Sequence, residues 1–325
     1  MKGFKKIKSI IALSLVILII VDLFPNVTVD AATNELTVHN IKVVNSDHKR
    51  GDATLLDCNG LYVLIDGGPN GSGYNQLYKY LNANCKRNSA GKIVLEAIII
   101  SHNHGDHYKG AMRILNDTTN FKVKKVYRTA IDVPTELKSA CKNATNGVEI
   151  MTVGKIIPLK FNGSTVTVYG PAKNFTSGQS TIKAIDVNNS STIVTADNGI
   201  ISGIFMGDLY KAGFEEAIKK YGTTLFNGNY NVCKYGHHGV RITNLVNGKV
   251  AQSLQDEVKL YKQYINASFY YLSASKNQIY NTDGTSDPDI YTNYRYIKTN
   301  LTNYHTIAAF EGNLVMCVPN MAVIN

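Results

Sequence analysis

The sequence predicts an α/β fold in which two packed β-sheets carry helices on both outer faces, an αββα four-layer sandwich. Three observations lead to this prediction. Apolar runs of strand length are followed by segments of helical periodicity in each half of the chain, which suits two sheets covered by helices. The run "IVLEAIIIS" (93–101) is almost continuously apolar, as in strands buried on both faces. No Pro-, Gly- or Ser-rich linker divides residues 35–325, so we expect one domain over residues 32–325.

The first half of the chain begins with strands. Residues 35–44 alternate as a strand does, and the apolar runs 51–58 and 61–68 are joined by Asn59-Gly60, a strong hairpin signal. The other elements predicted in this half are strands at 93–101 and 122–129 and helices at 75–85, 108–117 and 135–144.

The second half contains more strands. An amphipathic helix is predicted at 211–222, with Gly222 at its end. Further helices are predicted at 252–263 and 289–301, and strands at 165–170, 191–197, 201–208, 230–236, 267–275 and 305–318.

The first 31 residues have the features of a signal peptide. Four lysines precede an apolar stretch (10–21), and small residues near Ala31 and Ala32 offer a cleavage site. The stretch is shorter than the roughly 20 residues that a membrane span needs, which favours cleavage over a retained anchor. We therefore expect a secreted or cell-surface protein, with no integral membrane domain once residues 1–31 are removed.

Composition is that of a globular protein, with 44% apolar and 18% charged residues. Removing residues 1–31 takes away four Lys and two Asp, so the net charge falls from +10 to +8. This charge favours an anionic partner such as a phosphoester, nucleic acid or cell-wall polymer, although a solvated basic surface explains it as well. The five cysteines include no CxxC pair, which leaves one or two disulfides open.

The segment "IIISHNHGDHYKG" (98–110) concentrates metal-binding side chains directly after the buried strand. His102, His104, Asp106 and His107 fall within six positions. Imidazole nitrogens and carboxylates are preferred donors for zinc and other divalent ions, and several of them can face one point if the segment is a loop. A polar surface loop rarely gathers four such side chains, so the segment predicts a metal site.

These residues resemble a known family. The pattern S-H-x-H-x-D-H after an apolar strand resembles the second motif of the metallo-β-lactamase-fold hydrolases. "LIDGG" with Asp66, "IFMGD" with Asp208 and "CKYGHHG" resemble its first, fourth and fifth motifs, in the same order. With "GDATLL" and "NNSSTIV", the likeness is greatest to the hydrolase domain of ComEC-type DNA-uptake proteins and to phosphorylcholine esterases, and covers most of residues 38–318.

The resemblance implies a centre for one or two divalent metal ions, with zinc favoured and manganese as the alternative. It implies these ligands: His102 and His104 for the first ion, Asp106, His107 and His237 for the second, and Asp208 bridging both. Asp106 and Asp208 would be the catalytic carboxylates, and Asp66 would orient the histidine segment.

Further residues near the expected centre have alternative roles. His237 is preferred to His238 because the family's ligand is usually the first histidine of the pair, and His238 would then support the ligands or touch the substrate. Lys234 is a candidate for contact with an anionic substrate. No histidine lies between His107 and His237, so the third histidine that most members give the first ion is missing. Asn189, with Ser190, could line that side, although a simple turn is the slightly favoured alternative.

The function implied is that of an exported metal-dependent hydrolase, a phosphodiesterase or nuclease that acts through a metal-bound hydroxide. A lactonase or other acyl-ester hydrolase is the alternative. A β-lactamase is disfavoured because His107, not Gly, follows Asp106, and a flavo-diiron oxidoreductase because His104 stands where those proteins carry Glu. A non-catalytic binding module is less favoured still, since Asp106 and Asp208 are both present.

Overall fold

The computed structural model describes residues 35–44, 50–240, 246–247, 249–276, 288–301, 305–317 and 321–324. All of them belong to one compact unit, Asn34–Asn325. The expected signal peptide, residues 1–31, lies outside the described residues. No helix in the part of the chain that the structure describes combines the length and the apolar character needed to span a bilayer.

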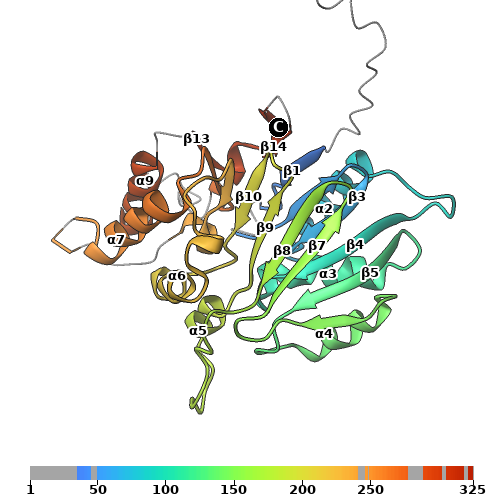
Figure 1. Ribbon diagram of the computed structural model, residues 1–325, viewed down its shortest axis with the longest axis horizontal. Helices are drawn as coiled ribbons and strands as arrows, with labels where there is room; N and C mark the ends of the chain where they lie inside the picture. The colour runs from blue at the N-terminus through green and yellow to red at the C-terminus, as the bar shows by residue number, and fades with distance from the viewer. Residues whose placement is uncertain are drawn as a thin grey trace, which may run out of the picture. The chain divides into compact units, whose positions relative to one another are not determined.

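The first sheet has eight strands, in the order β15-β14-β1-β2-β3-β4-β5-β6 (Figure 1). Strands β15 to β3 pair antiparallel and β3 to β6 pair parallel. Asn59 and Gly60 both have positive φ, which confirms the predicted hairpin between β2 and β3. The strands are β1 (Leu36–Asn40), β2 (Thr54–Cys58), β3 (Leu61–Ile65), β4 (Ile93–Ile100), β5 (Phe121–Arg128), β6 (Val148–Ile150), β14 (Asn313–Met316) and β15 (Met321–Ile324).

The second sheet has seven strands, in the order β13-β12-β11-β10-β9-β8-β7. Its β10–β13 half is parallel, and β7 to β10 pair antiparallel. The strands are β7 (Ile156–Phe161), β8 (Ser164–Tyr169), β9 (Ile193–Asp197), β10 (Ser202–Phe205), β11 (Val232–Lys234), β12 (Phe269–Leu272) and β13 (His305–Ala308).

Helices cover the outer face of each sheet. One apolar core joins the first sheet to α2 (Ser72–Asn84), α3 (Gly105–Asn116) and α4 (Thr135–Ala140). Another joins the second sheet to α6 (Lys211–Leu225), α7 (Gln252–Leu260) and α9 (Pro288–Asn300). The third core lies between the sheets, where Val63 and Ile99 of one face Val194 and Val232 of the other. These layers confirm the predicted αββα sandwich.

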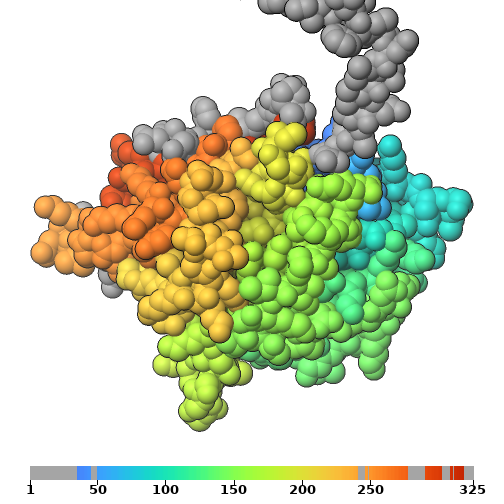
Figure 2. All heavy atoms as spheres, in the orientation of Figure 1, coloured from blue at the N-terminus to red at the C-terminus, as the bar shows by residue number. Residues whose placement is uncertain are grey.

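Short helical segments complete the described elements. They are α5 (Ala184–Asn189), the 3-10 turns Cys141–Asn143, Gly236–Gly239 and Ala309–Glu311, and the π-helical turn Tyr261–Ile265. The exposed segment that leads into α5 stands out from the rest of the unit in the space-filling view (Figure 2).

Several elements differ from the sequence-based expectation. The helix predicted at 108–117 begins at Gly105, so Asp106 lies in its first turn, where a carboxylate interacts favourably with the helix dipole. Helix α6 continues to Leu225 past a non-helical Gly222. The strand β7 was not predicted because Pro158 interrupts its pattern; it lies at the sheet edge, where proline is tolerated. The cysteines Cys58, Cys85, Cys141 and Cys233 are buried free thiols.

We predict that His39 makes folding sensitive to acid. This residue of β1 is buried, with Nδ1 2.8 Å from the Tyr80 hydroxyl, and burial lowers its pKa from 6.5 to about 4. The unfolded chain therefore takes up the proton first, so the free energy of unfolding falls as the pH drops from about 6.5 to 4, by about 3 kcal/mol. The free energy of unfolding in urea is measured across this pH range for the wild type and for His39→Gln. The same pH dependence in both proteins would contradict the prediction.

Candidate metal centre

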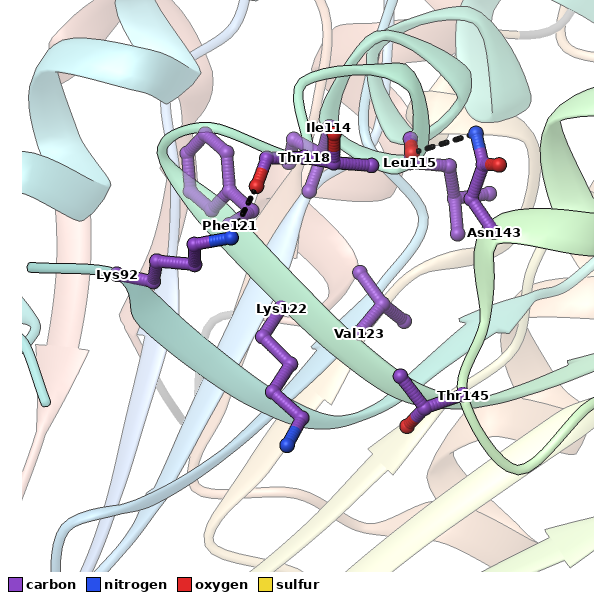
Figure 3. Close-up of a pocket in the computed structure, with 9 residues that line it drawn as sticks. All are labelled: Lys92, Ile114, Leu115, Thr118, Phe121, Lys122, Val123, Asn143 and Thr145. Carbon is purple, nitrogen blue, oxygen red and sulfur yellow. Dashed lines mark hydrogen bonds between the residues drawn. The ribbon is translucent and has the colours of Figure 1, made fainter. Parts of the chain in front are cut away.

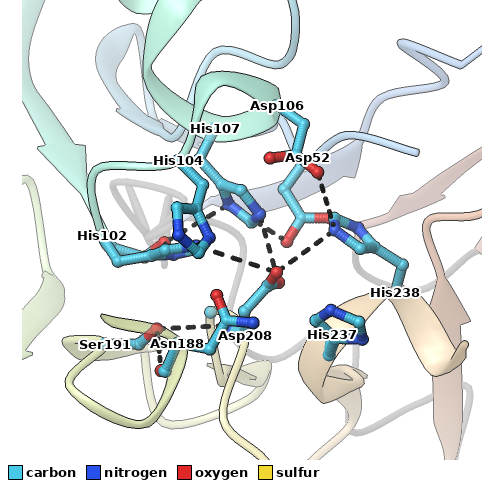
Figure 4. A network of polar contacts seen from close by, with 12 residues as sticks. Asp52, His102, His104, Asp106, His107, Asn188, Ser191, Asp208, His237 and His238 are labelled. Carbon is cyan, nitrogen blue, oxygen red and sulfur yellow. Dashed lines mark hydrogen bonds and ion pairs between the residues drawn. The ribbon is translucent and has the colours of Figure 1, made fainter. Parts of the chain in front are cut away.

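The candidate centre lies where strand ends of both sheets meet. Asp66 follows β3, and His102 follows β4 in the first sheet; Asp208 follows β10, and His238 follows β11 in the second. Because parallel strands end at the same edge of a sheet, the polar segments that follow them gather there. Figure 4 shows His102, Asp208 and His238 pointing toward one another from the two sheets.

Helix α3 is held against β3 by a backbone contact that only glycine permits. A Cβ at Gly110 would lie 1.8 Å from the Gly67 carbonyl oxygen, and one at Gly67 would lie 2.1 Å from the Ala111 nitrogen. The Gly67 N–H donates to the His107 carbonyl at 2.7 Å, and the Gly110 N–H donates to Gly68 at 2.9 Å. The first turn of α3 is thereby fixed beside the end of β3.

Asp66 contacts the histidine segment at two residues, Ser101 and His107. Its Oδ1 accepts the Ser101 N–H at 2.8 Å, and its Oδ2 accepts the Ser101 hydroxyl at 2.7 Å. The same Oδ2 lies 2.9 Å from His107 Nδ1, which leaves Nε2 as the nitrogen that faces the centre. A carboxylate behind a ligating imidazole is a common support for a metal ligand.

Asp208 is the carboxylate on which the histidines converge. It is buried, and its Oδ1 lies 3.1 Å from His107 Nε2. Its Oδ2 lies 3.3 Å from His238 Nε2 and 3.7 Å from His102 Nε2. Asp208 therefore faces candidate ligands of both predicted ions, as a bridging carboxylate must, with Oδ2 between His102 and His238.

The two histidines expected at the first ion, His102 and His104, lie close together. His102 Nε2 and His104 Nδ1 lie 3.1 Å apart. Burial is the main cause that lowers the pKa of both imidazoles, so each has an uncharged ring that can offer a lone pair. Asp106 Oδ2 lies 3.4 Å from His238 Nε2, so Asp106 also belongs to the cluster.

The side chains around Asp208 carry protons where a cation would fit. Burial lowers the pKa of His238, but Asp208 and Asp52 raise it more strongly, to about 10. The pKa of His107 is raised well above its usual value against the same burial effect, chiefly by Asp208. His107 Nε2, His238 Nε2 and Asp208 Oδ1 are buried without an aligned hydrogen-bond partner. A divalent ion would replace these protons with its own charge, so the residues fit a metal ion.

One sequence-based preference does not agree with this geometry. His238, not His237, faces Asp106 and Asp208. His237 lies with Nδ1 2.9 Å from the Val240 carbonyl oxygen and Nε2 2.9 Å from the Tyr210 hydroxyl. Both histidines have left-handed backbone, with φ of 46° and 59°, and this turn directs the second ring inward.

Asn189 also does not take the role expected of it, because its side chain binds backbone groups. Its Oδ1 accepts the backbone N–H groups of Tyr210 and Gly213 at 3.1 and 3.2 Å, so it fixes the start of α6. Asn188 lies beside Ser191, whose hydroxyl donates to the Asn188 carbonyl at 2.7 Å and accepts the Asp208 N–H at 3.1 Å. The Asn188 side chain is buried, and its Oδ1 has no hydrogen-bond partner among the described residues.

Lys234 does not reach solvent, contrary to the expectation that it contacts substrate. It is 3% exposed and forms an ion pair with Asp52. Sequence reasoning missed Asp52, although it lies in the "GDATLL" segment that carried part of the resemblance. Asp52, His107, Asp208 and His238 each offer a ligand atom, and these atoms lie within 4.8 Å of one another.

A separate pocket of about 330 Å³ lies at the start of β5, beside the C-terminal end of α3 (Figure 3). The Lys92 ammonium donates to the Thr118 carbonyl at 2.7 Å across its rim. The metal-binding side chains follow the end of β4 and the start of α3, so this pocket is not part of the candidate centre.

Comparison with known proteins gives no match to any family model or curated protein. Among solved structures, the metallo-β-lactamase-fold protein YhfI from Bacillus subtilis is 12% identical, with 84% of this chain and 96% of that one covered and a TM-score of 0.49. A possible metal-dependent hydrolase from Veillonella parvula is 12% identical, with 85% and 96% covered and a TM-score of 0.43. A metallo-β-lactamase from Hirschia baltica is 16% identical, with 60% and 84% covered and a TM-score of 0.36. Likenesses this weak transfer no activity, so the function is argued from this chain's own residues.

We predict that His238, and not His237, is a metal ligand. His238→Asn should lower zinc affinity by more than roughly 100-fold, because its Nε2 faces both Asp106 and Asp208. His237→Asn is the matched control, since asparagine also tolerates the left-handed backbone of both positions. Competition with a zinc-binding dye measures both variants. A loss of affinity in His237→Asn alone would refute the assignment.

Proposed function

We propose that this chain is an exported metal-dependent hydrolase that cleaves phosphodiester bonds. The observation that carries the proposal is the buried carboxylate of Asp208, which faces imidazoles of both ligand groups. A carboxylate in this position can hold two divalent ions side by side. Bound ions would lower the pKa of a water molecule and neutralise charge that builds up on a phosphoryl oxygen.

The candidate metal ligands of this chain form two groups. His102 and His104 form one group. Asp106, His107 and His238 form the other, and Asp208 lies between the two groups. Asp66 holds the tautomer of His107 by facing its Nδ1.

The choice of a phosphodiester rests on positive charge at the rim of the centre and on the motif resemblance. Arg50 Nε lies 3.4 Å from Asp106 Oδ2, and the Arg50 side chain is 40% exposed. An exposed guanidinium next to metal ligands can pair with a phosphate oxygen. The basic balance of +8 after loss of residues 1–31 and the motifs shared with ComEC-type domains and phosphorylcholine esterases support the same class of substrate.

Export is part of the proposal and rests on the sequence of residues 1–31. The basic start, the short apolar stretch and the small residues near Ala32 support cleavage by a signal peptidase. The mass of the protein recovered from culture medium tests this. A chain that starts at Ala32 would agree, and a chain that retains residues 1–31 would not.

We expect purified residues 32–325 loaded with zinc or manganese to hydrolyse bis-p-nitrophenyl phosphate. Single-stranded DNA and p-nitrophenyl phosphorylcholine would show which phosphodiester is preferred, and a lactone and nitrocefin test acyl hydrolysis. Chelation should abolish turnover, and His104→Ala should lower kcat/KM at least about 100-fold, because several kcal/mol of charge stabilisation are lost.

Two variants make the assay specific. Arg50→Gln should raise KM for the phosphodiester and leave KM for a neutral lactone unchanged, because only the anionic substrate pairs with the guanidinium. Glu96→Gln on β4, whose carboxylate pairs with Lys124 at 2.7 Å, should behave as wild type. Turnover of the lactone or nitrocefin alone would overturn the phosphodiester assignment, and full activity in His104→Ala would overturn metal dependence.

A further inference from the structure

The imidazoles of His107 and His238 share one carboxylate behind them. Each ring directs Nε2 toward Asp208, at 3.1 and 3.3 Å. Each ring directs Nδ1 the other way, toward Asp52: Oδ1 lies 3.1 Å from His238 Nδ1 and Oδ2 lies 3.6 Å from His107 Nδ1. Asp52 therefore lies at the back of both rings.

Asp52 is held in place by groups from three segments. Its Oδ2 forms an ion pair with the buried ammonium of Lys234 on β11, and its Oδ1 accepts the Ser273 hydroxyl after β12. Its own N–H donates to the Asp106 carbonyl at 3.2 Å. The neighbouring Gly51 N–H donates to the Ser273 carbonyl at 3.4 Å, so the backbone is fixed as well.

Lys234 connects this carboxylate to the one at the centre. Its ammonium donates to the Gly207 carbonyl at 2.8 Å and lies 3.5 Å from Asp208 Oδ1. A buried ammonium without a partner is strongly destabilising, so Asp52 and Lys234 need one another. The pair spans from the start of β2 in the first sheet to β11 in the second.

We propose that Asp52 and Lys234 are positioning residues that hold His107 and His238 in the orientation that binds metal, and that neither is itself a ligand. This inference rests on the proposed metal-dependent function. His107 also has a second carboxylate behind it, Asp66, at 2.9 Å. Behind His238, Asp52 is the one carboxylate near Nδ1 among the residues that the structure describes, and the Ser273 hydroxyl, 2.9 Å from His238 Nδ1, itself donates to Asp52. The effect of losing the pair should therefore fall mainly on His238.

The decisive variant is the neutral double replacement, Asp52→Asn with Lys234→Met. Replacing both members of a buried ion pair is often close to neutral for stability, so the metal-free double variant should unfold in urea near the wild-type midpoint. Lys234→Met alone removes the ammonium that pairs with the buried Asp52 carboxylate and leaves only the two imidazoles facing it, so this variant should be clearly less stable. Adding Asp52→Asn to it should restore stability and not metal affinity, which separates positioning from a structural role.

Zinc affinity is measured by competition with a coloured chelator, and geometry by the visible absorption of the cobalt(II)-loaded protein. We expect the double variant to bind the same number of ions as wild type, with affinity reduced roughly 10- to 100-fold and an altered cobalt spectrum. Glu96→Gln, which removes an ion pair remote from the centre, should match wild type in both measurements.

Each other outcome has a definite meaning. Wild-type affinity and spectrum in the double variant would overturn the inference alone. The loss of one bound ion per chain would identify Asp52 as a ligand and also overturn it. Wild-type protein that binds no zinc, cobalt or manganese would overturn the proposed function, and this inference with it.

Discussion

The burial of the Asp208 carboxylate is the constraint on which the centre depends. A side chain that is 2% exposed cannot keep its charge without compensation. Burial would raise the pKa of Asp208, and His107 and His238 instead hold it well below its usual value. The ends of strands from both sheets supply these positive groups, and the negative charges of Asp52 and Asp66 stand behind them. Outward from the Asp208 carboxylate, the network therefore has positive imidazoles first and negative carboxylates behind them.

Local sequence pattern was sufficient for much of the fold and for part of the centre. The long apolar strand β4 and the periodic helices α2 and α6 are visible in the chain because their burial is set by their own residues. His102, His104, Asp106 and His107 could be recognised because they lie within six positions. The element β7 was missed because edge strands keep few buried positions and here include Pro158.

The remaining parts of the centre depend on contacts between distant segments. Asp52 meets His238 across 186 residues, a contact that no local pattern contains. The choice between His237 and His238 depends on two left-handed residues in succession, and the choice between Asn188 and Asn189 depends on where α5 ends. In each case the sequence identifies the pair of residues near the centre, and the backbone conformation decides which of the two side chains points into it.

The division of the ligand candidates between the two sheets has a consequence for the whole fold. His102 and His107 belong to the first sheet, and Asp208 and His238 to the second. An ion bound among them would connect the two halves in addition to the ion pairs that already cross between them at this edge, such as Asp52 with Lys234. Metal concentration would then become a determinant of thermal stability, adding about 1.4 kcal/mol for every tenfold excess over the dissociation constant. In surroundings where metal supply varies, the lifetime of the folded protein would follow that supply together with its activity.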